Sequence, residues 1–208
     1  MRRLIIDTAT EALSVALIDD DTLVDCHYEV VGRGHAEKLI PVLAALEGGG
    51  RAGEIVADAG PGSFTGVRVG LSAARALAFA WGVGLRIYSS LALLAAMARE
   101  DEACAGDDAI CIVMTGGHGE LFWQKFDRMT LSPLTDLAST PIAALAGSID
   151  GDTFFGSGAE TLVTARGAGR SVPLLADARY ARLLPQSLIG PDAPPLYGRG
   201  ADAVVPQA

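Results

Sequence analysis

The chain of 208 residues has little of several residue types, and each shortage excludes a class of protein. Its three cysteines, at positions 26, 104 and 111, form no C-x-x-C pair, which argues against a disulfide framework and against a structural zinc site. Its three histidines, at positions 27, 35 and 118, form no helical pair of metal ligands. We therefore expect reduced, buried thiols and no metal site.

Positive charge and long apolar segments are also scarce. The formal net charge is −9, whereas a broad nucleic-acid footprint needs a basic surface, so the chain alone is expected to bind tRNA or DNA poorly. The apolar run Leu4–Ile6 before Asp7 is far too short for a signal peptide. The longest apolar helix carries two arginines near its middle, which disfavours insertion into a membrane. The expected compartment is the cytoplasm.

Half of the residues are hydrophobic, so the chain can bury a substantial core. Each half of the chain opens with a strand hairpin, which predicts two α/β lobes, residues 1–100 and residues 101–208. Strands are expected at Arg3–Asp7, Leu13–Ile18, Thr22–Val30, Glu54–Asp58, Leu85–Tyr88, Ala109–Met114, Glu120–Asp127 and Thr153–Phe155. Helices are expected at His35–Leu46, from about Gly66 to Trp81, from Ser89 or Ser90 to about Arg99, near Pro141–Ala146, after Gly158 and at Ala178–Pro185.

The long helix before Gly82 organises the rest of the chain. A Gly-Pro-Gly turn precedes it, and Ser63 and Thr65 can cap its first amide groups. Small residues recur every four positions and so form one row along it, namely Gly66, Gly70, Ala74 and Ala78. Such a row lets another backbone approach closely. Two readings stay open: the row packs only on its own sheet, or a partner helix also covers this helix.

Two turns could hold phosphate groups. Asp7, Thr8 and Thr10 follow the first strand, where a strand-end carboxylate can hold a metal-bound water and turn hydroxyls can hold phosphate oxygens. Thr115, Gly116 and Gly117 occupy the matching hairpin of the second lobe. The alternative, which the pattern alone favours, is that both are ordinary hairpin turns. No Walker A lysine follows Gly66.

Three motifs together resemble the TsaB (YeaZ) family, the dimerisation subunit of the bacterial tRNA threonylcarbamoyladenosine synthase. They are Asp7–Leu17, His35–Pro41 and the highly specific Gly60–Gly70. The resemblance is strong over residues 1–100 and weak afterwards, recovering at Gly119–Trp123 and at Pro195–Arg199. It implies an actin-like (ASKHA, RNase H-like) α/β fold with two lobes and a mixed sheet in each.

The resemblance also implies a function. A subunit of this family is not itself the transferase but binds a catalytic paralogue, TsaD, and an ATPase, TsaE. Together they attach threonylcarbamoyl to adenosine 37 of tRNAs that read codons starting with A. ATP and Mg²⁺ are used by the complex, and no cofactor is expected of this subunit alone. A homodimer is expected in isolation, with tRNA contacted mainly through the complex.

Pairing in the family uses helices of the first lobe, with TsaD or with a second copy. The matching positions here, and hence the expected interface residues, are Gly66, Arg68, Gly70, Ala74, Arg75, Ala78, His35 and Leu39. Gly70→Leu or Ala74→Leu is expected to break partner binding while the monomer stays folded, because a bulky side chain prevents close approach of helices.

The catalytic paralogue carries a His-x-x-x-His metal pair shortly after its long helix, whereas Ile87–Leu94 here contains no histidine. No catalytic residue and no metal ligand is therefore expected. Thr115–His118, however, resembles the paralogue's Ser-Gly-Gly-His loop. Two alternatives remain: a small nucleotide-binding enzyme of the actin-like superfamily, and a glycoprotease-like (M22-type) metallopeptidase relative.

Overall fold

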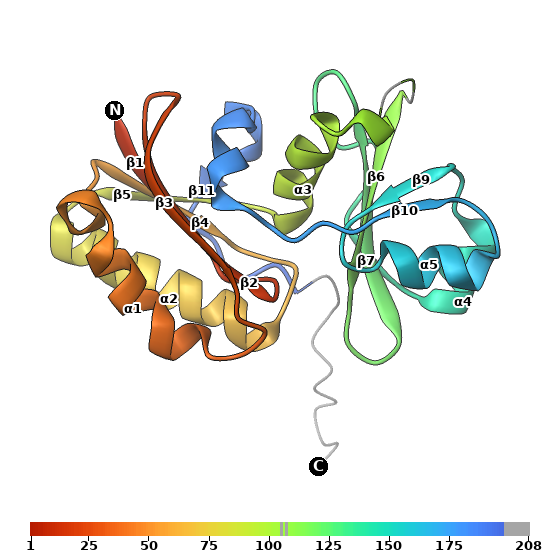
Figure 1. Cartoon of the computed structure of the whole chain (residues 1–208), viewed down its shortest axis with the longest axis horizontal. Coiled ribbons are helices and arrows are strands. Elements are labelled where there is room, and N and C mark those ends of the chain that lie inside the picture. The colour runs from red at the N-terminus through yellow and green to blue at the C-terminus, as the bar shows by residue number, and fades with distance from the viewer. Residues whose placement is uncertain (105, 107, 198–208) are drawn as a thin grey trace, which may run out of the picture.

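The structure, a computed structural model, describes residues 1–104, 106 and 108–197. Two lobes lie side by side, each built on one mixed β-sheet, as the sequence predicted (Figure 1). None of the described helices combines the length and the apolarity that crossing a membrane requires.

Within the described residues, the sheet of the first lobe has six strands in the order β11-β5-β4-β1-β2-β3. An antiparallel meander of β1 (Arg2–Asp7), β2 (Ala12–Asp19) and β3 (Thr22–Val30) opens the chain, as expected. β4 (Glu54–Asp58) and β5 (Gly84–Tyr88) then add parallel strands beside β1. The carboxyl ends of β1, β4 and β5 therefore meet at one edge of the sheet.

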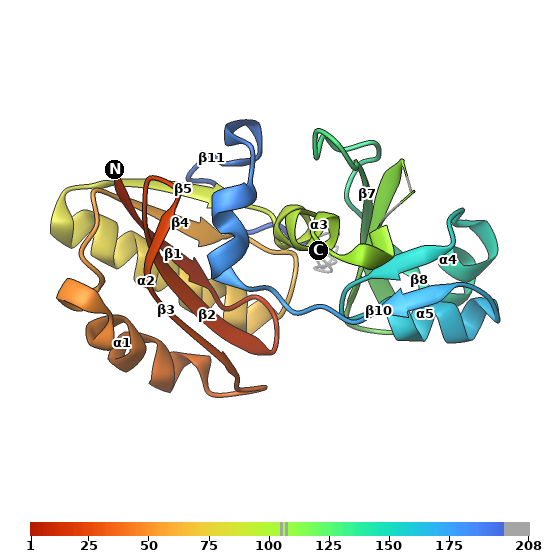
Figure 2. The ribbon, with the colours of Figure 1, turned by 45° about the horizontal axis from the view of Figure 1, so that its top comes forward.

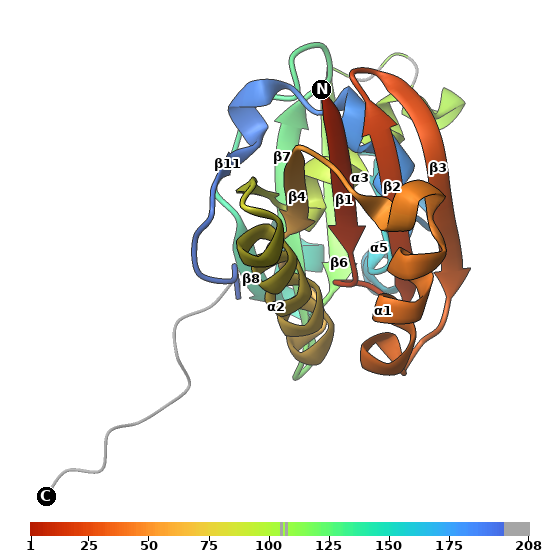
Figure 3. The same ribbon diagram turned by 90° about the vertical axis from the view of Figure 1, so that its left-hand side faces the viewer.

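Two helices cover one face of this sheet side by side, α1 (His35–Ala45) and α2 (Phe64–Trp81) (Figure 3). α2 begins two residues before its predicted start, because Ser63 Oγ accepts a hydrogen bond from the Gly66 amide at 3.3 Å and so caps the helix. Gly82 ends it in the left-handed conformation, with φ 67°. A short 3₁₀ helix, Glu47–Gly50, follows α1.

α3 (Ser90–Arg99) lies between the two lobes (Figure 2). Ser89 caps it by accepting a hydrogen bond from the Leu91 amide at 3.3 Å. Apolar side chains of both sheets pack around the helix in one continuous cluster, with Ile5 and Val56 from the first lobe and Ile112 and Phe155 from the second. The lobes therefore share a core and are not independent folding units.

In the part of the chain that the structure describes, the second lobe has five strands in the order β10-β9-β6-β7-β8. β6 (Ala109–Thr115) and β7 (Glu120–Asp127) form its opening hairpin, after the 3₁₀ turn Glu102–Cys104. β8 (Ala138–Pro141) and β10 (Arg170–Val172) are short strands that the sequence did not predict. β9 (Thr153–Phe155), α4 (Ile142–Ser148) and α5 (Ala159–Arg166) complete the lobe close to their expected positions.

The C-terminal part of the chain returns to the first lobe, so the predicted assignment of residues 101–208 to the second lobe is wrong at its C-terminal end. The expected helix at 178–185 is a 3₁₀ helix, Ala178–Leu183, whose first amide donates to Ser14 Oγ of β2 at 2.8 Å. After a second 3₁₀ turn, Gln186–Leu188, β11 (Gly190–Pro191) pairs antiparallel with β5. Residues 198–208 of the predicted lobe lie outside the described residues.

Candidate functional site

The row of small residues on α2 packs against its own sheet. A Cβ added to Gly66 would lie 2.0 Å from the Thr8 carbonyl oxygen, and one added to Gly70 would lie 2.5 Å from Thr8 Oγ1. Ala74 and Ala78 are buried in the same interface. A leucine at Gly70 would therefore meet Thr8, and one at Ala74 would stand at a fully buried position, so we expect both variants to destabilise the monomer.

The two candidates on α1 are also turned inward. His35 is 7% exposed, and its Nε2 lies within hydrogen-bond distance, 3.2 Å, of the Ala12 carbonyl oxygen. Leu39 is 1% exposed and packs in the core between α1, α2 and the sheet. Both residues hold α1 on the first lobe and offer little surface to a partner.

The two arginines of α2 hold the returning C-terminal segment. Arg75 donates to both carboxylate oxygens of Asp192, at 2.7–3.2 Å, and to the Ala193 carbonyl oxygen at 2.9 Å. Arg68 Nε donates to the Tyr197 hydroxyl at 3.1 Å. The predicted interface residues are thus either buried or engaged within the chain.

The outward faces of α1 and α2, which the sequence argument missed, are exposed instead. Phe79 is 91% exposed and Ile40 is 54% exposed. Small side chains, Ser72 and Ala76 among them, surround Phe79 on the outward face of α2. The signal that could have found this face is periodicity, because these positions fall between the members of the buried row.

The turn after β1 is largely buried. Asp7 is 1% exposed; it accepts hydrogen bonds from the Tyr88 hydroxyl at 2.9 Å and from the Ala9 amide at 3.2 Å. Thr8 Oγ1 donates to the Gly66 carbonyl oxygen at 2.7 Å. These two phosphate candidates thus serve the packing of the first lobe.

A second carboxyl group that the sequence argument overlooked lies beside Asp7. Asp58 ends β4, which runs parallel to β1 in register, and it accepts from Ser90 Oγ at 2.6 Å and from the Gly60 amide at 2.7 Å. Burial raises the pKa of Asp58 well above its ordinary value, and the Asp7 carboxylate raises it further. Burial also raises the pKa of Asp7. The sequence signal that could have revealed this carboxyl pair is that β1 and β4 both end in aspartate.

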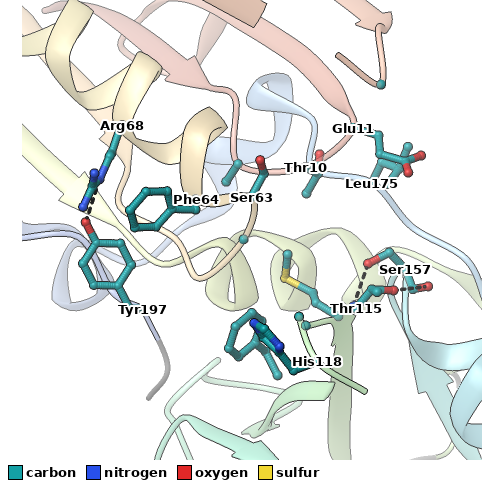
Figure 4. A pocket seen from close by; sticks show the side chains of 17 residues that line it. Thr10, Glu11, Ser63, Phe64, Arg68, Thr115, His118, Ser157, Leu175 and Tyr197 are labelled. Atoms are coloured by element: carbon teal, nitrogen blue, oxygen red, sulfur yellow. Dashed lines mark hydrogen bonds between the residues drawn. The ribbon is translucent and has the colours of Figure 1, made fainter. Parts of the chain in front are cut away.

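A cleft of about 880 Å³ lies between the lobes (Figure 4). The first lobe lines it with Thr10 and with residues from the beginning of α2, and the second lobe with the turn between β6 and β7. The structure therefore places Thr10 and the turn residues Thr115, Gly116 and Gly117 around the same cleft, as the hypothesis of two phosphate-binding turns requires. Asp7 and Thr8 do not line the cleft.

The turn between β6 and β7 has a defined shape. The Thr115 amide donates to Ser157 Oγ at 3.1 Å, and Thr115 Oγ1 donates to the Ser157 carbonyl oxygen at 3.2 Å. Gly116 comes so close to the returning strand that an added Cβ would lie 2.8 Å from the Glu120 carbonyl oxygen. His118 adopts φ 59°, which turns the chain back and places the imidazole at the cleft. Across residues 1–104, 106 and 108–197, no group of three or more His, Cys, Asp or Glu side chains could hold a metal ion.

Comparison with known proteins places the chain in a family. The family model described as TsaD, tRNA N6-adenosine threonylcarbamoyltransferase, matches residues 27–149, more than half of the chain. The tRNA threonylcarbamoyladenosine biosynthesis protein TsaB of Escherichia coli is 36% identical over 133 residues, which cover 62% of this chain and 56% of that protein. YeaZ from Pseudomonas aeruginosa superposes with a TM-score of 0.72 at 30% identity, covering 88% of this chain and 89% of that one. The chain belongs to the TsaB (YeaZ) family.

Coverage of the relatives by sequence is partial. TsaB of Bacillus subtilis is 33% identical over 104 residues, which cover 48% of this chain and 45% of that protein. The chain thus matches about half the length of these curated TsaB proteins. A Bacteroides thetaiotaomicron protein with an actin-like ATPase fold superposes with a TM-score of 0.50 at 10% identity over 88% of this chain and 94% of that one, a likeness of fold alone. The predicted actin-like fold is thereby confirmed.

Proposed function

We propose that this chain is a non-catalytic scaffold subunit in tRNA threonylcarbamoyladenosine biosynthesis, which binds a TsaD-like catalytic subunit and a TsaE-like ATPase. The names of its Escherichia coli and Bacillus subtilis relatives support the pathway. The matched family model supports a common origin with the transferase. In this proposal the chain contributes a surface, and tRNA is contacted mainly through the assembled complex.

The outward faces of α1 and α2 form the proposed docking surface. The observation that carries the proposal is Phe79, whose ring is 91% exposed at the centre of small side chains such as Ala76. An aromatic ring surrounded by small residues can enter a pocket on a partner while the helix backbones approach closely. The exposed Ile40 extends the apolar surface onto α1.

The charge distribution supports the same surface. The only charged residues of α2 are Arg68 and Arg75, and both contact the C-terminal segment. Arg75 is paired with Asp192, and Arg68 lies at the beginning of the helix against Phe64 and Tyr197. The outward positions Ser72, Ala76 and Phe79 carry no charge, and the centres of protein interfaces are depleted of charge in the same way. A second copy of the chain could use this surface too, so a homodimer and the complex with TsaD would compete.

Light scattering on size-exclusion chromatography tests the proposal, with the chain alone and mixed with TsaD from the same organism. Wild type is expected to form a homodimer that exchanges into a mixed complex. Ala76→Arg and Phe79→Glu should abolish both, because each places a charge at the centre of the surface. Met129→Glu is the matched control, since Met129 is an apolar side chain 77% exposed on the other lobe.

Two outcomes would contradict the docking surface: complex formation by Ala76→Arg and Phe79→Glu as tight as that of wild type, or equal loss in Met129→Glu. The pathway itself is tested in cells depleted of their own TsaB. Wild type and Met129→Glu should restore the threonylcarbamoyladenosine content of tRNA measured by mass spectrometry, and the two α2 variants should not. Failure of wild type to restore the nucleoside would refute the proposed pathway.

A further inference from the structure

The edge strands of the two sheets differ in length and in composition. Within the described residues, three of the four edge strands are short, because β8 has four residues, β10 three and β11 two. β8 and β11 also end in proline, which has no amide group to donate to a further strand. β3 has nine residues without proline or glycine, and it lies at the outer edge of the first sheet (Figure 3). Short strands and prolines protect a sheet edge from another chain, so β3 is the edge that lacks this protection.

The hydrogen bonds beside β3 show which of its backbone groups point away from the sheet. The Val31 amide, directly after the strand, donates to the Glu11 carbonyl oxygen at 2.9 Å and so faces β2. Alternate residues of an antiparallel strand bond to the same neighbour, so the other odd-numbered residues back to position 27 face β2 as well. Cys26, Tyr28 and Val30 therefore direct their amide and carbonyl groups outward, where the described residues offer no further strand.

The same three residues carry an apolar row of side chains. Tyr28 is 39% exposed and Val30 is 56% exposed, and half-buried Cys26 continues the row. Tyr28 lies opposite Ser14 of β2, whose Oγ accepts from the Ala178 amide, so the row is on the sheet face away from α1. Unpaired backbone beside exposed apolar side chains is the combination that strand addition uses.

A carboxylate closes the edge at one point. Asp25 Oδ1 accepts a hydrogen bond from the outward Cys26 amide at 2.8 Å, and Asp25 Oδ2 accepts one from the Glu47 amide at 2.7 Å. The groups that remain open to a further strand are the Cys26 carbonyl and the amide and carbonyl groups of Tyr28 and Val30.

We propose that β3 pairs in antiparallel orientation with β3 of a second copy of the chain, with the two-fold axis at Tyr28. About four backbone hydrogen bonds then form. The two Tyr28 residues exchange a pair of bonds, and each Val30 amide donates to the Cys26 carbonyl oxygen of the other copy, so that Asp25 keeps its contact. The two tyrosine rings meet across the axis, a favourable cross-strand pair.

Charge complementarity selects this position of the axis. It places His27 opposite Glu29 of the second copy on both sides of the axis, a donor against a carboxylate. An axis at His27 would set Asp25 opposite Glu29, and an axis at Glu29 would set the two Glu29 carboxylates opposite each other, both of which are repulsive. An axis at Cys26 would need the amide that Asp25 occupies. The outward faces of α1 and α2 contribute no residue to this contact.

Sedimentation equilibrium on the full chain tests the pairing. The contact is small, so we expect a Kd of about 100 µM, too weak to persist during size-exclusion chromatography. Phe79→Glu, which blocks the α2 surface, should therefore show a monomer–dimer equilibrium at concentrations between about 20 µM and about 500 µM.

Two further changes in the Phe79→Glu chain should each weaken the dimer about tenfold or more. Tyr28→Lys places two like charges across the axis, and Val30→Pro removes an outward amide while it leaves the bonds to β2 intact. Leu23→Lys is the matched control, because Leu23 belongs to the same strand and is also 39% exposed but lies outside the paired segment. It should associate as the Phe79→Glu chain does.

Disulfide formation tests the register. In a Cys26→Ser chain, Tyr28→Cys places two thiols directly opposite each other, at a Cα separation that a disulfide allows. Oxidised glutathione should convert this variant into a covalent dimer, as the two thiols are oxidised and each glutathione disulfide is reduced to two thiols. Leu23→Cys in the same chain should stay largely monomeric.

A Phe79→Glu chain that remains monomeric at about 500 µM would refute the pairing, since that concentration lies well above the expected Kd. Equal cross-linking of Tyr28→Cys and Leu23→Cys would refute the register. Loss of TsaD binding in a chain that carries Tyr28→Lys alone, together with a monomeric Phe79→Glu chain, would assign the edge to TsaD instead of a second copy. The equilibrium measurement contains no TsaD, so its result is independent of the proposed function.

Discussion

The turns that follow the first strand of each lobe contain threonines in opposite environments. In the first lobe, Thr8 is 1% exposed and bonded to Gly66, so this part of the turn is packed against α2, whereas Thr10 lines the cleft. In the second lobe, Thr115 is exposed and lines the interlobe cleft. The difference is the long helix: α2 has 18 residues and covers its turn, whereas α4 and α5 have seven and eight and cover only the far side of their sheet. The long helix therefore buries Thr8 in a packing contact, while the corresponding Thr115 stays open to the cleft.

The largest expected effect comes from adding a methyl group where α2 packs against the turn of the first lobe. Gly66→Ala would place Cβ 2.0 Å from the Thr8 carbonyl oxygen, and we expect a loss of about 3 kcal/mol or more in the free energy of unfolding. Gly116→Ala, 2.8 Å from the Glu120 carbonyl oxygen, should cost about 1 kcal/mol because the open turn can move. Urea denaturation measures both.

Gly147 of α4 supplies the control, because an added Cβ there meets nothing within 4 Å. Gly147→Ala should be neutral or should stabilise the protein by up to about 1 kcal/mol. Equal losses at Gly66 and Gly116 would show that the two turns do not differ in rigidity.

The buried carboxyl pair makes the stability of the first lobe depend on pH. The pKa values of Asp7 and Asp58 are raised, so the folded state binds a proton that the unfolded chain releases. The stability gained from holding this proton is fully present below the ordinary pKa of an aspartate. It is lost as the pH rises through the raised pKa of the folded state. Stability should therefore fall with pH above about 4, by at most about 1.4 kcal/mol per pH unit for one proton.

Asp58→Asn removes one member of the pair and should flatten this decrease. The measurement is the denaturation midpoint at several values between about pH 5 and about pH 8. Parallel curves for wild type and variant would show that the pair does not share a proton. Asp127→Asn in the second lobe is the control. Hydrogen bonds from the Thr130 hydroxyl and amide lower the pKa of this half-buried carboxyl group, so the variant should leave the slope above pH 5 unchanged.

A smaller difference in stability is expected between variants of the two turn threonines, Thr8 and Thr115. Thr8→Val removes the hydroxyl that donates to the buried Gly66 carbonyl oxygen and should cost about 1–2 kcal/mol. Thr115→Val exposes its partners to water in the cleft and should change stability by no more than about 0.5 kcal/mol. Thermal unfolding of the two variants measures the difference, and a reversed order would contradict the assignment of Thr8 to a packing contact and of Thr115 to the open cleft.

The smallest expected effect concerns the segment that returns across α2. Arg75 and Asp192 are each about 40% exposed, so their ion pair should contribute only about 0.5–1 kcal/mol. A double-mutant cycle with Arg75→Leu and Asp192→Asn measures this coupling. A coupling near zero would show that the other contacts of the segment hold it, such as the β11–β5 pairing and the hydrogen bond from the Leu196 amide to the Ala59 carbonyl oxygen.

The pattern of the sequence predicted most elements of the first lobe because their signals are local. Ser63, Gly82 and Ser89 mark helix ends by their own hydrogen-bonding and backbone preferences. Short strands such as β10 and β11 carry no such signal, because three or two residues cannot show alternation. They form only because a neighbouring strand is already in place.

The candidate sites were predicted less well, since burial depends on which face of an element is covered. Periodicity identified the small-residue row of α2 but not the direction it faces, and Gly70 proved to face Thr8. The turn residues Thr10 and Thr115 were found by their chemistry, whereas Arg68 required the returning segment to place Tyr197 beside it. Contacts between residues 129 positions apart leave no trace in local sequence.

The pairing of β11 with β5 has a consequence for synthesis on the ribosome. Residues 190 and 191 complete a sheet whose first strand begins at residue 2. Although domains generally fold as units from the N-terminus, the first lobe here must wait with an open sheet edge until the second lobe has been translated. A chain released early would expose the edge of β5, so a truncated product should be prone to aggregation.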